Sequence, residues 1–360
     1  MKRIKVIPAL LMVIGLSLSA CSTGGATPQP TAARPTAIED VVVGLSIGTT
    51  AEERWQREIE MFETCAEEQG FTLLMRNGEE SVEAQLQQCE ELLEQDIQVL
   101  IIQSIDAEAY GPIVDAAHKK GVPVISYDRF IMNCDLDYYV TFDSYTVGRL
   151  QAELVVPRAT SGNYIWLKGS PIDNNAHLIA EGQGDVLRPY VNLGAINIVL
   201  EEWCEDWSAD SARELTELGL TMANGDIQGV IASNDVTAGG AIEALAAHGL
   251  NVPISGQDAD LAACRRIVQG TQTGTVYKPT ALLNQAACEL AVALAMGQDP
   301  VSGVSPELGT WQELSNNFKD VPSFTVDVVE VDQSNLIDVV VNEYAYHSLE
   351  DLGQKEGDIL

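Results

Sequence analysis

Clusters of polar and aromatic side chains occur where the predicted strands of this chain end. Carboxylate, carboxamide and guanidinium groups dominate these clusters, and each planar group can engage two neighbouring hydroxyls because its forked geometry matches a vicinal diol. A tryptophan at a cleft edge can cover the C–H face of a pyranose ring. This chemistry suits an uncharged polyhydroxylated ring. The clusters are Glu53-Arg54-Trp55, Tyr127-Asp128-Arg129, Gly169 to Asn175, Trp203 to Trp207, Ser233-Asn234-Asp235, Ser255 to Asp258 and Tyr277-Lys278-Pro279.

Each of these residues, taken alone, also has a purely structural explanation. Asn234 and Asp173 could each cap the helix that follows. Asp128 and Arg129 could form a surface ion pair that contributes little to stability, and Trp55 lies at helical spacing and could belong to the core. The convergence of all the clusters on one rim favours a binding site over these separate explanations.

Short apolar runs alternate with amphipathic segments from residue 41 onward. This pattern is typical of a parallel sheet with helices on both faces. The first strand is expected at 41–47, and the helix at 52–69 stops at Gly70. The same rhythm restarts near residue 145, so we expect an α/β protein with two similar, doubly wound parallel-sheet lobes. Ligands of such sheets bind beyond the carboxyl ends of the strands, where the polar clusters occur.

The order of the predicted elements also indicates how the two lobes are connected. A long helix at 282–296 returns to the first lobe, and a strand at 324–331 goes back to the second. The chain would then cross between the lobes three times and leave a hinged cleft. The assigned segments are 41–143 with 279–320 for the N-terminal lobe and 144–278 with 321–360 for the C-terminal lobe.

The first forty residues predict secretion and a lipid anchor. Basic residues precede an apolar run too short to span a bilayer, which is typical of a signal peptide at 1–20. The run ends in Leu18-Ser19-Ala20-Cys21, which resembles a bacterial lipobox and makes Cys21 the expected lipidation site; the alternative is an ordinary signal peptide. Residues 21–40 are rich in Thr, Pro, Ala and Gly and predict a flexible tether. We expect an extracytoplasmic protein, in the periplasm or at the cell surface, that touches the membrane only through its lipid.

The formal net charge of −33 restricts the partners of the chain. So acidic a surface repels phosphate backbones, which argues against nucleic-acid binding by the usual electrostatic route. A neutral ligand is compatible with this charge. The charge itself serves solubility or reflects the medium of the organism, and it does not identify a function.

The six cysteines after Cys21 could form up to three disulfides in an extracellular protein. We expect pairs between Cys65 and Cys89 and between Cys264 and Cys288, because each pair falls on consecutive predicted helices. Cys134 and Cys204 are expected not to pair with each other, since a bond between them would tie the lobes together. None of the cysteines has the spacing of a zinc site, and no metal or cofactor is expected.

The sequence from about residue 41 to 345 resembles the D-xylose-binding proteins of bacterial ABC sugar importers, in the type I periplasmic-binding-protein superfamily. The specific stretches include Glu53-Arg54-Trp55-Gln56, Tyr127-Asp128-Arg129, Gly169 to Ala176, Ile254 to Leu261 and Thr275 to Pro279. The resemblance implies stacking by Trp55 and Trp207. It also implies sugar contacts at Arg54, Asp128, Arg129, Asp173, Asn175, Asn234, Asp258 and Lys278.

The resemblance implies a monomeric receptor that delivers a monosaccharide to an ABC importer permease. D-xylose is favoured, and arabinose, ribose, galactose and glucose remain alternatives. A receptor that serves a chemoreceptor or a sensor kinase is the nearest competing function, because its sugar site could be identical. A glycosidase is disfavoured since the carboxylates come with neutralising cations, and a sugar-responsive transcription regulator would carry a DNA-reading headpiece where this chain has its signal peptide.

Overall fold

The computed structural model describes residues 34–355. The predicted signal peptide, Cys21 and most of the predicted tether lie outside this range. Residues Ala32–Leu360 form one compact unit, which holds all the hydrophobic clusters described below. Within the range from 34 to 355, no helix is both long enough and apolar enough to cross a membrane.

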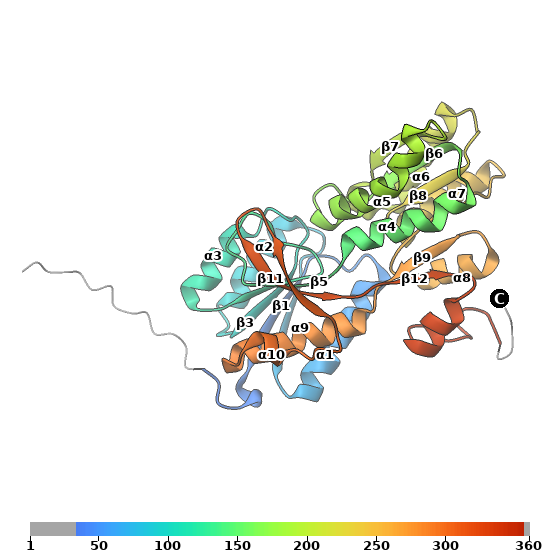
Figure 1. Ribbon diagram of the computed structural model, residues 1–360. Coiled ribbons are helices and arrows are strands. Elements are labelled where there is room, and N and C mark those ends of the chain that lie inside the picture. Colours follow the sequence, from blue (N-terminus) through green and yellow to red (C-terminus); the bar gives the residue numbers. More distant parts are fainter. Residues whose placement is uncertain (1–33, 356–360) are drawn as a thin grey trace, which may run out of the picture. The chain divides into compact units, whose positions relative to one another are not determined.

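A seven-stranded sheet forms the centre of what we call the first lobe (Figure 1). Its strand order is β10-β11-β5-β4-β3-β1-β2. All neighbours are parallel except β10 and β11, which form an antiparallel hairpin at one edge. The strands are β1 (Val42–Ile47), β2 (Thr72–Asn77), β3 (Val99–Gln103), β4 (Val124–Tyr127), β5 (Tyr138–Phe142), β10 (Thr310–Ser315) and β11 (Asp320–Val326).

Helices cover both faces of this sheet, as the continuous apolar strands predict. Side chains alternate along β3, so Val99 and Ile101 pack with α1 and α9 on one face while Leu100 and Ile102 pack with α2 and α3 on the other. The helices are α1 (Glu53–Gln69), α2 (Val82–Leu93), α3 (Gly111–Lys120), α9 (Thr280–Met296) and the short α10 (Pro300–Gly303), and a 3₁₀ turn, η1 (Ile38–Asp40), precedes β1.

The second lobe contains a three-stranded parallel sheet of order β7-β6-β8 and an antiparallel pair, β12 with β9. Single parallel bridges from Val230 to Ile254 and from Gln257 to Val276 connect them. Its strands are β6 (Gly162–Lys168), β7 (Ile196–Trp203), β8 (Gly229–Ala232), β9 (Gly274–Tyr277) and β12 (Val329–Asp332). Its helices are α4 (Ser144–Val155), α5 (Asn174–Asn192), α6 (Ala209–Met222), α7 (Asp235–Ala247) and α8 (Leu261–Gln269), with the turns η2 (Val156–Arg158) and η3 (Glu205–Trp207) and the π-helical η4 (Ile337–Glu343).

Close packing against α4 fixes the position of α5 in the second lobe. A Cβ atom on Gly148 would collide with the backbone oxygen of Ile179, and one on Gly182 would collide with that of Tyr145. Glycine is therefore required at both positions for the helices to approach this closely. The N-terminus of α5 is thereby held at the end of β6, where Asp173 and Asn175 lie.

The chain changes lobe three times, after β5, after β9 and after β11. The single strand expected at 324–331 is wrong. Residues up to Val326 complete β11 in the first sheet, and Val329 begins β12 beside β9 in the second lobe. No glycine or proline marks this bend, so the two strands read as one apolar run. The third crossing accordingly falls at 327–328, and residues 321–326 lie in the sheet of the first lobe.

The expected disulfides are also wrong, since Cys65, Cys89, Cys264 and Cys288 are all free. Cys65 lies with α1 on one face of the first sheet, whereas Cys89 lies with α2 on the other. Cys264 belongs to the core of the second lobe and Cys288 to that of the first. Consecutive helices of a doubly wound sheet can cover opposite faces, which separates Cys65 from Cys89. The crossing between lobes after β9 separates Cys264 from Cys288.

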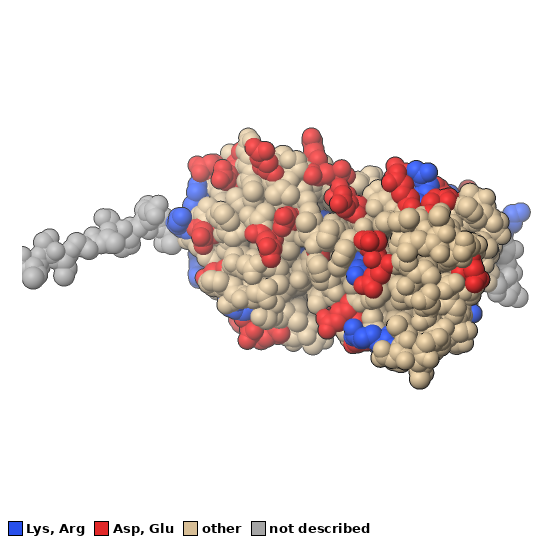
Figure 2. All heavy atoms as spheres, turned by 90° about the horizontal axis from the view of Figure 1, so that it is seen from above, with Lys and Arg blue, Asp and Glu red and all other residues tan. Residues whose placement is uncertain are grey.

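Acidic side chains are spread over the face shown in Figure 2, on both lobes, and the basic side chains visible there are fewer. This distribution agrees with 53 acidic against 20 basic residues in the chain. The acidic charge is a general property of this face, and no single patch carries it. The cations considered next are buried in the interior.

Candidate functional site

All ten residues predicted to bind a ligand line one cavity between the lobes. The first lobe supplies Arg54 and Trp55 from the start of α1 and Asp128 and Arg129 from the end of β4. Lys278 lies on the crossing after β9. The second lobe supplies Asp173, Asn175, Trp207, Asn234 and Asp258, and the remaining lining residues are Glu52, Ser144, Ile179 and Gln257. The strand-end rule therefore placed these side chains correctly, while their role in binding stays a prediction.

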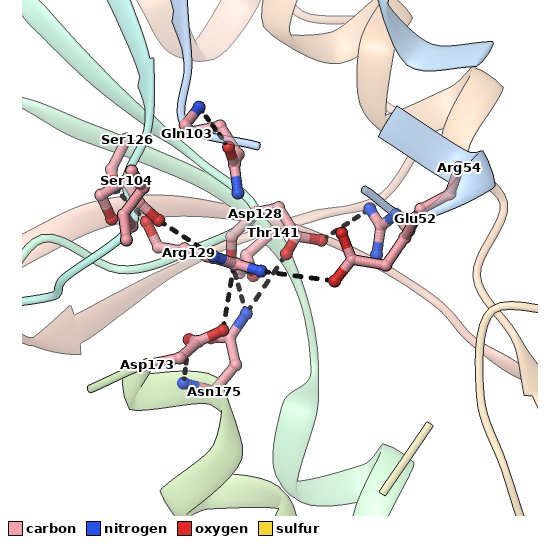
Figure 3. A network of polar contacts seen from close by, with 12 residues as sticks. Glu52, Arg54, Gln103, Ser104, Ser126, Asp128, Arg129, Thr141, Asp173 and Asn175 are labelled. Carbon is pink, nitrogen blue, oxygen red and sulfur yellow. Dashed lines mark hydrogen bonds and ion pairs between the residues drawn. The ribbon is translucent and has the colours of Figure 1, made fainter. Parts of the chain in front are cut away.

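Arg54 is almost completely buried. Figure 3 shows its guanidinium directed towards Asp128. Its Nη2 donates to Asp128 Oδ2 at 2.9 Å, and its Nη1 donates to Asp258 Oδ1 at 3.2 Å. The Nε atom donates to Glu58 Oε1 at 2.8 Å, one turn further along α1. Because Asp258 belongs to the second lobe, this single guanidinium connects both walls of the cavity.

Arg129 makes a second connection between the lobes, on the other side of the cavity (Figure 3). Its Nε lies 3.0 Å from Asp173 Oδ2, and its Nη2 lies 4.0 Å from Glu52 Oε1. Asp173 also accepts a hydrogen bond from the backbone N–H of Asn175. Asp173 thus has both roles considered for it, as a helix cap and as a cavity carboxylate.

The charges of the cavity are partly neutralised. Burial alone would raise the pKa of Asp128, but Arg54, Lys278 and Arg129 together lower it below its usual value. Burial raises the pKa of Asp173 despite the opposing effect of Arg129. Asp128 is therefore held in its charged form. A cavity in which three cations face the carboxylates suits a neutral ligand better than an anion.

Lys278 completes the charge arrangement. Its Nζ lies 3.0 Å from Asp258 Oδ1 and 3.8 Å from Asp128 Oδ2. Arg54 and Lys278 thus share the same two carboxylates. Each carboxylate keeps unused lone pairs, because an ionised carboxylate offers about four acceptor sites, and these can receive ligand hydroxyls.

The two asparagines are held by different contacts. Asn175 Nδ2 donates to the backbone oxygen of Asp128 at 2.8 Å, and its Oδ1 accepts from Tyr139 at 3.2 Å. Asn234 caps α7 in a reciprocal capping box with Thr237. The capping explanation for Asn234 is confirmed, and the same side chain lines the cavity.

Three site residues have left-handed backbone conformations. The φ angles are 59° at Asp128, 94° at Asp258 and 55° at Trp207. Such angles are uncommon for residues other than glycine and cost free energy, so they persist only where the surrounding structure imposes them. Here they turn the side chains at the strand ends into the cavity.

The aromatic walls are formed by Trp55 and Trp207, both buried. The ring centroid of Trp55 lies 4.1 Å from Arg54 Cζ and 5.5 Å from Arg129 Cζ, so the ring packs beside both cations. Trp207 packs over Gly169, where a Cβ atom would collide with the indole. Four buried atoms in this wall lack a hydrogen-bond partner within residues 34–355, namely both indole Nε1 atoms, Glu52 Oε2 and Gln257 Oε1. Unpaired buried polar groups of this kind are candidates for ligand contacts.

Sequence reasoning missed Glu52 and Glu58. Glu58 is fully buried beneath Arg54, accepts a hydrogen bond from Tyr127, and has a pKa raised by burial. Its four-residue spacing from Arg54 was the available signal, because such residues share one helix face. Glu52 lies at the N-cap of α1, directly after the first strand-end loop, so the strand-end rule applied to it as well.

Within the described part of the chain, no three His, Cys, Asp or Glu side chains are placed to hold a metal ion. The cavity itself has a volume of about 30 Å³. That is room for a water or two, so a sugar ring could enter only if the lobes or side chains move.

Two lobes with parallel sheets, three crossings and a polar cavity between them define a solute-binding protein of the periplasmic type. The model of the periplasmic binding protein domain family matches residues 43–299. A D-xylose-binding periplasmic protein of Escherichia coli (strain K12) is 40% identical over 307 residues, which cover 85% of this chain and 91% of that protein. The D-xylose-binding periplasmic protein of Haemophilus influenzae is 40% identical over 316 residues, with 87% and 92% covered. The chain belongs to the periplasmic binding protein family, a class of binding proteins and not of enzymes.

Two solved structures of solute-binding proteins have the same fold as this chain. A carbohydrate transporter solute-binding protein from Chloroflexus aurantiacus, in complex with D-glucose, matches with a TM-score of 0.79 and 32% identity, covering 86% of this chain and 97% of that one. An ABC transporter solute-binding protein from Clostridium phytofermentans with bound β-D-glucose matches with a TM-score of 0.80 and 28% identity, covering 86% and 99%. The fold is therefore that of the type I periplasmic binding proteins, as the sequence predicted.

Proposed function

We propose that this chain is the extracytoplasmic receptor that binds a monosaccharide, D-xylose in the first place, and presents it to an ABC importer. The observation that carries the proposal is the set of ten predicted side chains around one cavity between two lobes. Its forked carboxylates, carboxamides and guanidinia match vicinal diols, and its two indoles offer flat apolar walls. The D-xylose-binding relatives at 40% identity support the choice of sugar.

Binding would proceed by closure of the hinge. The sugar docks on one lobe when the cleft is open, and the contacts of the other lobe stabilise the closed form. Arg54 and Arg129 connect the two lobes through Asp258 and Asp173. A sugar that places its hydroxyls among these groups makes its full set of contacts only when the cleft is closed. The closed shape is then the form that the permease recognises.

The competing sugar is glucose, which the two solved relatives named above hold. Glucose carries one hydroxymethyl group more than xylose. Xylose selectivity thus requires a side chain that fills the space of this group, and Ile179 and Trp207 are the apolar side chains of the lining besides Trp55. Arabinose and ribose differ from xylose only in the arrangement of hydroxyls, so they test the carboxylates and carboxamides instead.

Lipidation of Cys21 and attachment to the cell membrane belong to the same proposal. Leu18-Ser19-Ala20-Cys21 and the Thr- and Pro-rich stretch after it support this anchor. A tethered receptor stays near its permease, which raises the local concentration of loaded protein. A receptor for a chemoreceptor or sensor kinase would use the same closed form, so a transport assay is needed to separate the two partners.

A thermal-shift screen of the body Ala32–Leu360 against a panel of aldoses tests the proposal. A ligand that binds only the folded protein raises the melting temperature by mass action. We expect the largest shift with D-xylose at equal concentration. A larger shift with D-glucose would make the protein a glucose receptor, and no shift with any aldose would exclude a monosaccharide receptor.

A further inference from the structure

Two cysteines that the binding site does not use lie against each other between α1 and α9. Both helices begin at the cleft, α1 after Glu52 and α9 after Pro279, and both pack on the same face of the first sheet. Asn284 Nδ2 donates to Glu58 O at 3.2 Å, and Thr280 Oγ1 lies 4.0 Å from Met61 Sδ. These contacts place the two helices side by side.

The register of the two helices brings Cys65 to Cys288. The two contacting pairs just described are 226 and 219 positions apart in the chain. The separation of 223 from Cys65 to Cys288 falls between these values. Both side chains also pack in the same hydrophobic cluster on this face of the sheet. The pair that the sequence suggested, Cys65 with Cys89, is replaced by a pair on one face of the sheet.

The two thiols have different environments. Cys65 is half-buried and lines an open groove of about 1120 Å³ beside α1 and α9, so its sulfur can be reached from solvent. Cys288 is fully buried behind it. The neighbouring Cys288 thiol lowers the pKa of Cys65, and Gln69 Nε2 donates to Cys65 Sγ at 3.1 Å. The neighbouring Cys65 thiol and then burial raise the pKa of Cys288.

We propose that Cys65 and Cys288 are a disulfide-forming pair that links α1 to α9 when the protein meets an oxidising thiol–disulfide pool. The Cys65 thiolate attacks one sulfur of a donor disulfide, such as oxidised glutathione or the disulfide of a thiol oxidoreductase, and the other donor sulfur leaves as a thiolate. Cys288 then attacks the sulfur of Cys65, the second donor sulfur leaves as a thiolate, and this thiolate takes up the proton of Cys288. Two thiols become one disulfide, and both electrons reduce the donor.

A disulfide between Cys65 and Cys288 would connect two helices that position predicted sugar-binding residues. Arg54 lies in the first turn of α1, and Lys278 lies two residues before α9. Both side chains contact Asp258 of the second lobe. A bond between Cys65 and Cys288 fixes the far parts of these helices to each other, so it stabilises the first lobe on which the cleft closes. The inference uses the extracytoplasmic location of the proposed function, where disulfides persist.

Thiol counting on the compact body Ala32–Leu360 tests the pair. The protein is purified reduced, treated with excess oxidised glutathione and alkylated under denaturing conditions, and the masses and peptide maps are recorded. We expect four alkylated cysteines of the six, a peptide map that joins Cys65 to Cys288, and a melting temperature that falls by about 5 °C on reduction. Cys65→Ser should leave all five remaining thiols free, whereas Cys288→Ser should leave four free and hold Cys65 as a mixed disulfide with glutathione. Neither variant should form an internal link.

Cys204→Ser is the matched control, because Cys204 is a buried cysteine in the core of the second lobe. This variant should keep the link and leave three free thiols of five. Six free thiols in the oxidised wild-type protein, or a link between any other two cysteines, would overturn the proposal. Calorimetric titration of the reduced protein with D-xylose is run in parallel, so that a failure of sugar binding is seen separately from a failure of disulfide formation.

Discussion

Arg54 and Asp258 form a buried ion pair of 3.2 Å across the cleft, although 204 positions separate them in the chain. Arg54 belongs to α1 of the first lobe, and Asp258 precedes α8 in the second. Opening of the cleft must separate the two side chains and expose both to water. The free energy of closure therefore includes this pair, and a ligand that bonds to both partners shifts the equilibrium towards the closed form.

Arg129→Ala should weaken sugar binding without unfolding the protein. The variant removes the guanidinium that lies 3.0 Å from Asp173 and that faces the cavity beside Trp55. Loss of a charge-assisted hydrogen bond costs about 1.5–3 kcal/mol, so the Kd should rise about 10- to 150-fold. Calorimetry measures the affinity, and circular dichroism during heating monitors the fold.

Arg149→Ala is the control for this substitution, since Arg149 forms an exposed ion pair with Glu153 on α4. It should bind sugar as the wild type does. An Arg129→Ala protein that melts cooperatively and titrates like the wild type would remove Arg129 from the binding site.

Gly169→Ala should disturb the apolar wall of the cavity, although Gly169 itself does not line the cavity. The new methyl group would occupy the space of the Trp207 indole, which is buried and cannot retreat freely. A displaced ring loses its contact with the sugar face, and the Kd should rise about 3- to 10-fold. Gly111→Ala is the matched control, because a Cβ there meets only an ordinary contact with Cys134. Equal affinities in the two variants would contradict a stacking role for Trp207.

The sequence alone could predict which residues lie at the cavity, because the ends of parallel strands share one edge of a sheet. It could not predict how they pair. Arg54 reaches Asp258 across the hinge, and no local pattern encodes a contact between lobes. The left-handed backbone conformation at Asp128 and Asp258 could not be predicted either, because neither residue is the glycine that usually signals such a conformation.

The sequence also could not predict which face of the first sheet each helix covers. Cys65 and Cys89 lie on consecutive helices with similar amphipathic patterns, and only the three-dimensional order of β1, β2 and β3 places these helices on opposite faces. The bend between β11 and β12 was missed for a different reason. The bend contains no glycine or proline, and its exposed Asp327 alone could equally be a solvent-facing position within one strand.

Asp260→Asn should make the stability of the protein less dependent on pH. Asp260 is half-buried, with its Oδ1 atom shielded from solvent. Desolvation followed by the charges of Asp235 and Asp258 raises its pKa well above the usual value. A group whose pKa is raised by folding contributes stability that is fully present below its unfolded pKa, about 3.9 for Asp, and is lost as the pH rises through the folded value. Asparagine does not ionise, so the loss between pH 5 and pH 8 should shrink in the variant.

Urea unfolding at pH 5 and pH 8 measures this difference. Each unit by which the folded pKa is raised within this window corresponds to about 1.4 kcal/mol of the free energy of unfolding. Asp115→Asn replaces an exposed carboxyl on α3 and serves as the control. The same pH dependence in Asp260→Asn and in the wild type would show that Asp260 does not carry the extra proton.

Arg57→Ala should lower sugar affinity although Arg57 does not line the cavity. Its Nη1 donates to the backbone oxygen of Tyr346 at 2.7 Å, and its guanidinium lies 4.6 Å from the centroid of the Tyr346 ring. Tyr346 packs with the core of the second lobe, so this contact joins the lobes outside the cavity. Because closure forms the contact, its loss should raise the Kd about 2- to 10-fold and favour the open form.

Glu53→Ala separates this effect from a change in α1 itself. Arg57 also pairs with Glu53 at 2.6 Å within the helix, and the control removes that pair while it leaves the contact with Tyr346. Small-angle X-ray scattering of the ligand-free proteins should show a larger radius of gyration for Arg57→Ala than for Glu53→Ala. If both variants bind sugar with the wild-type Kd and scatter alike, the contact between Arg57 and Tyr346 contributes nothing to closure, and the cavity residues alone determine the closed state.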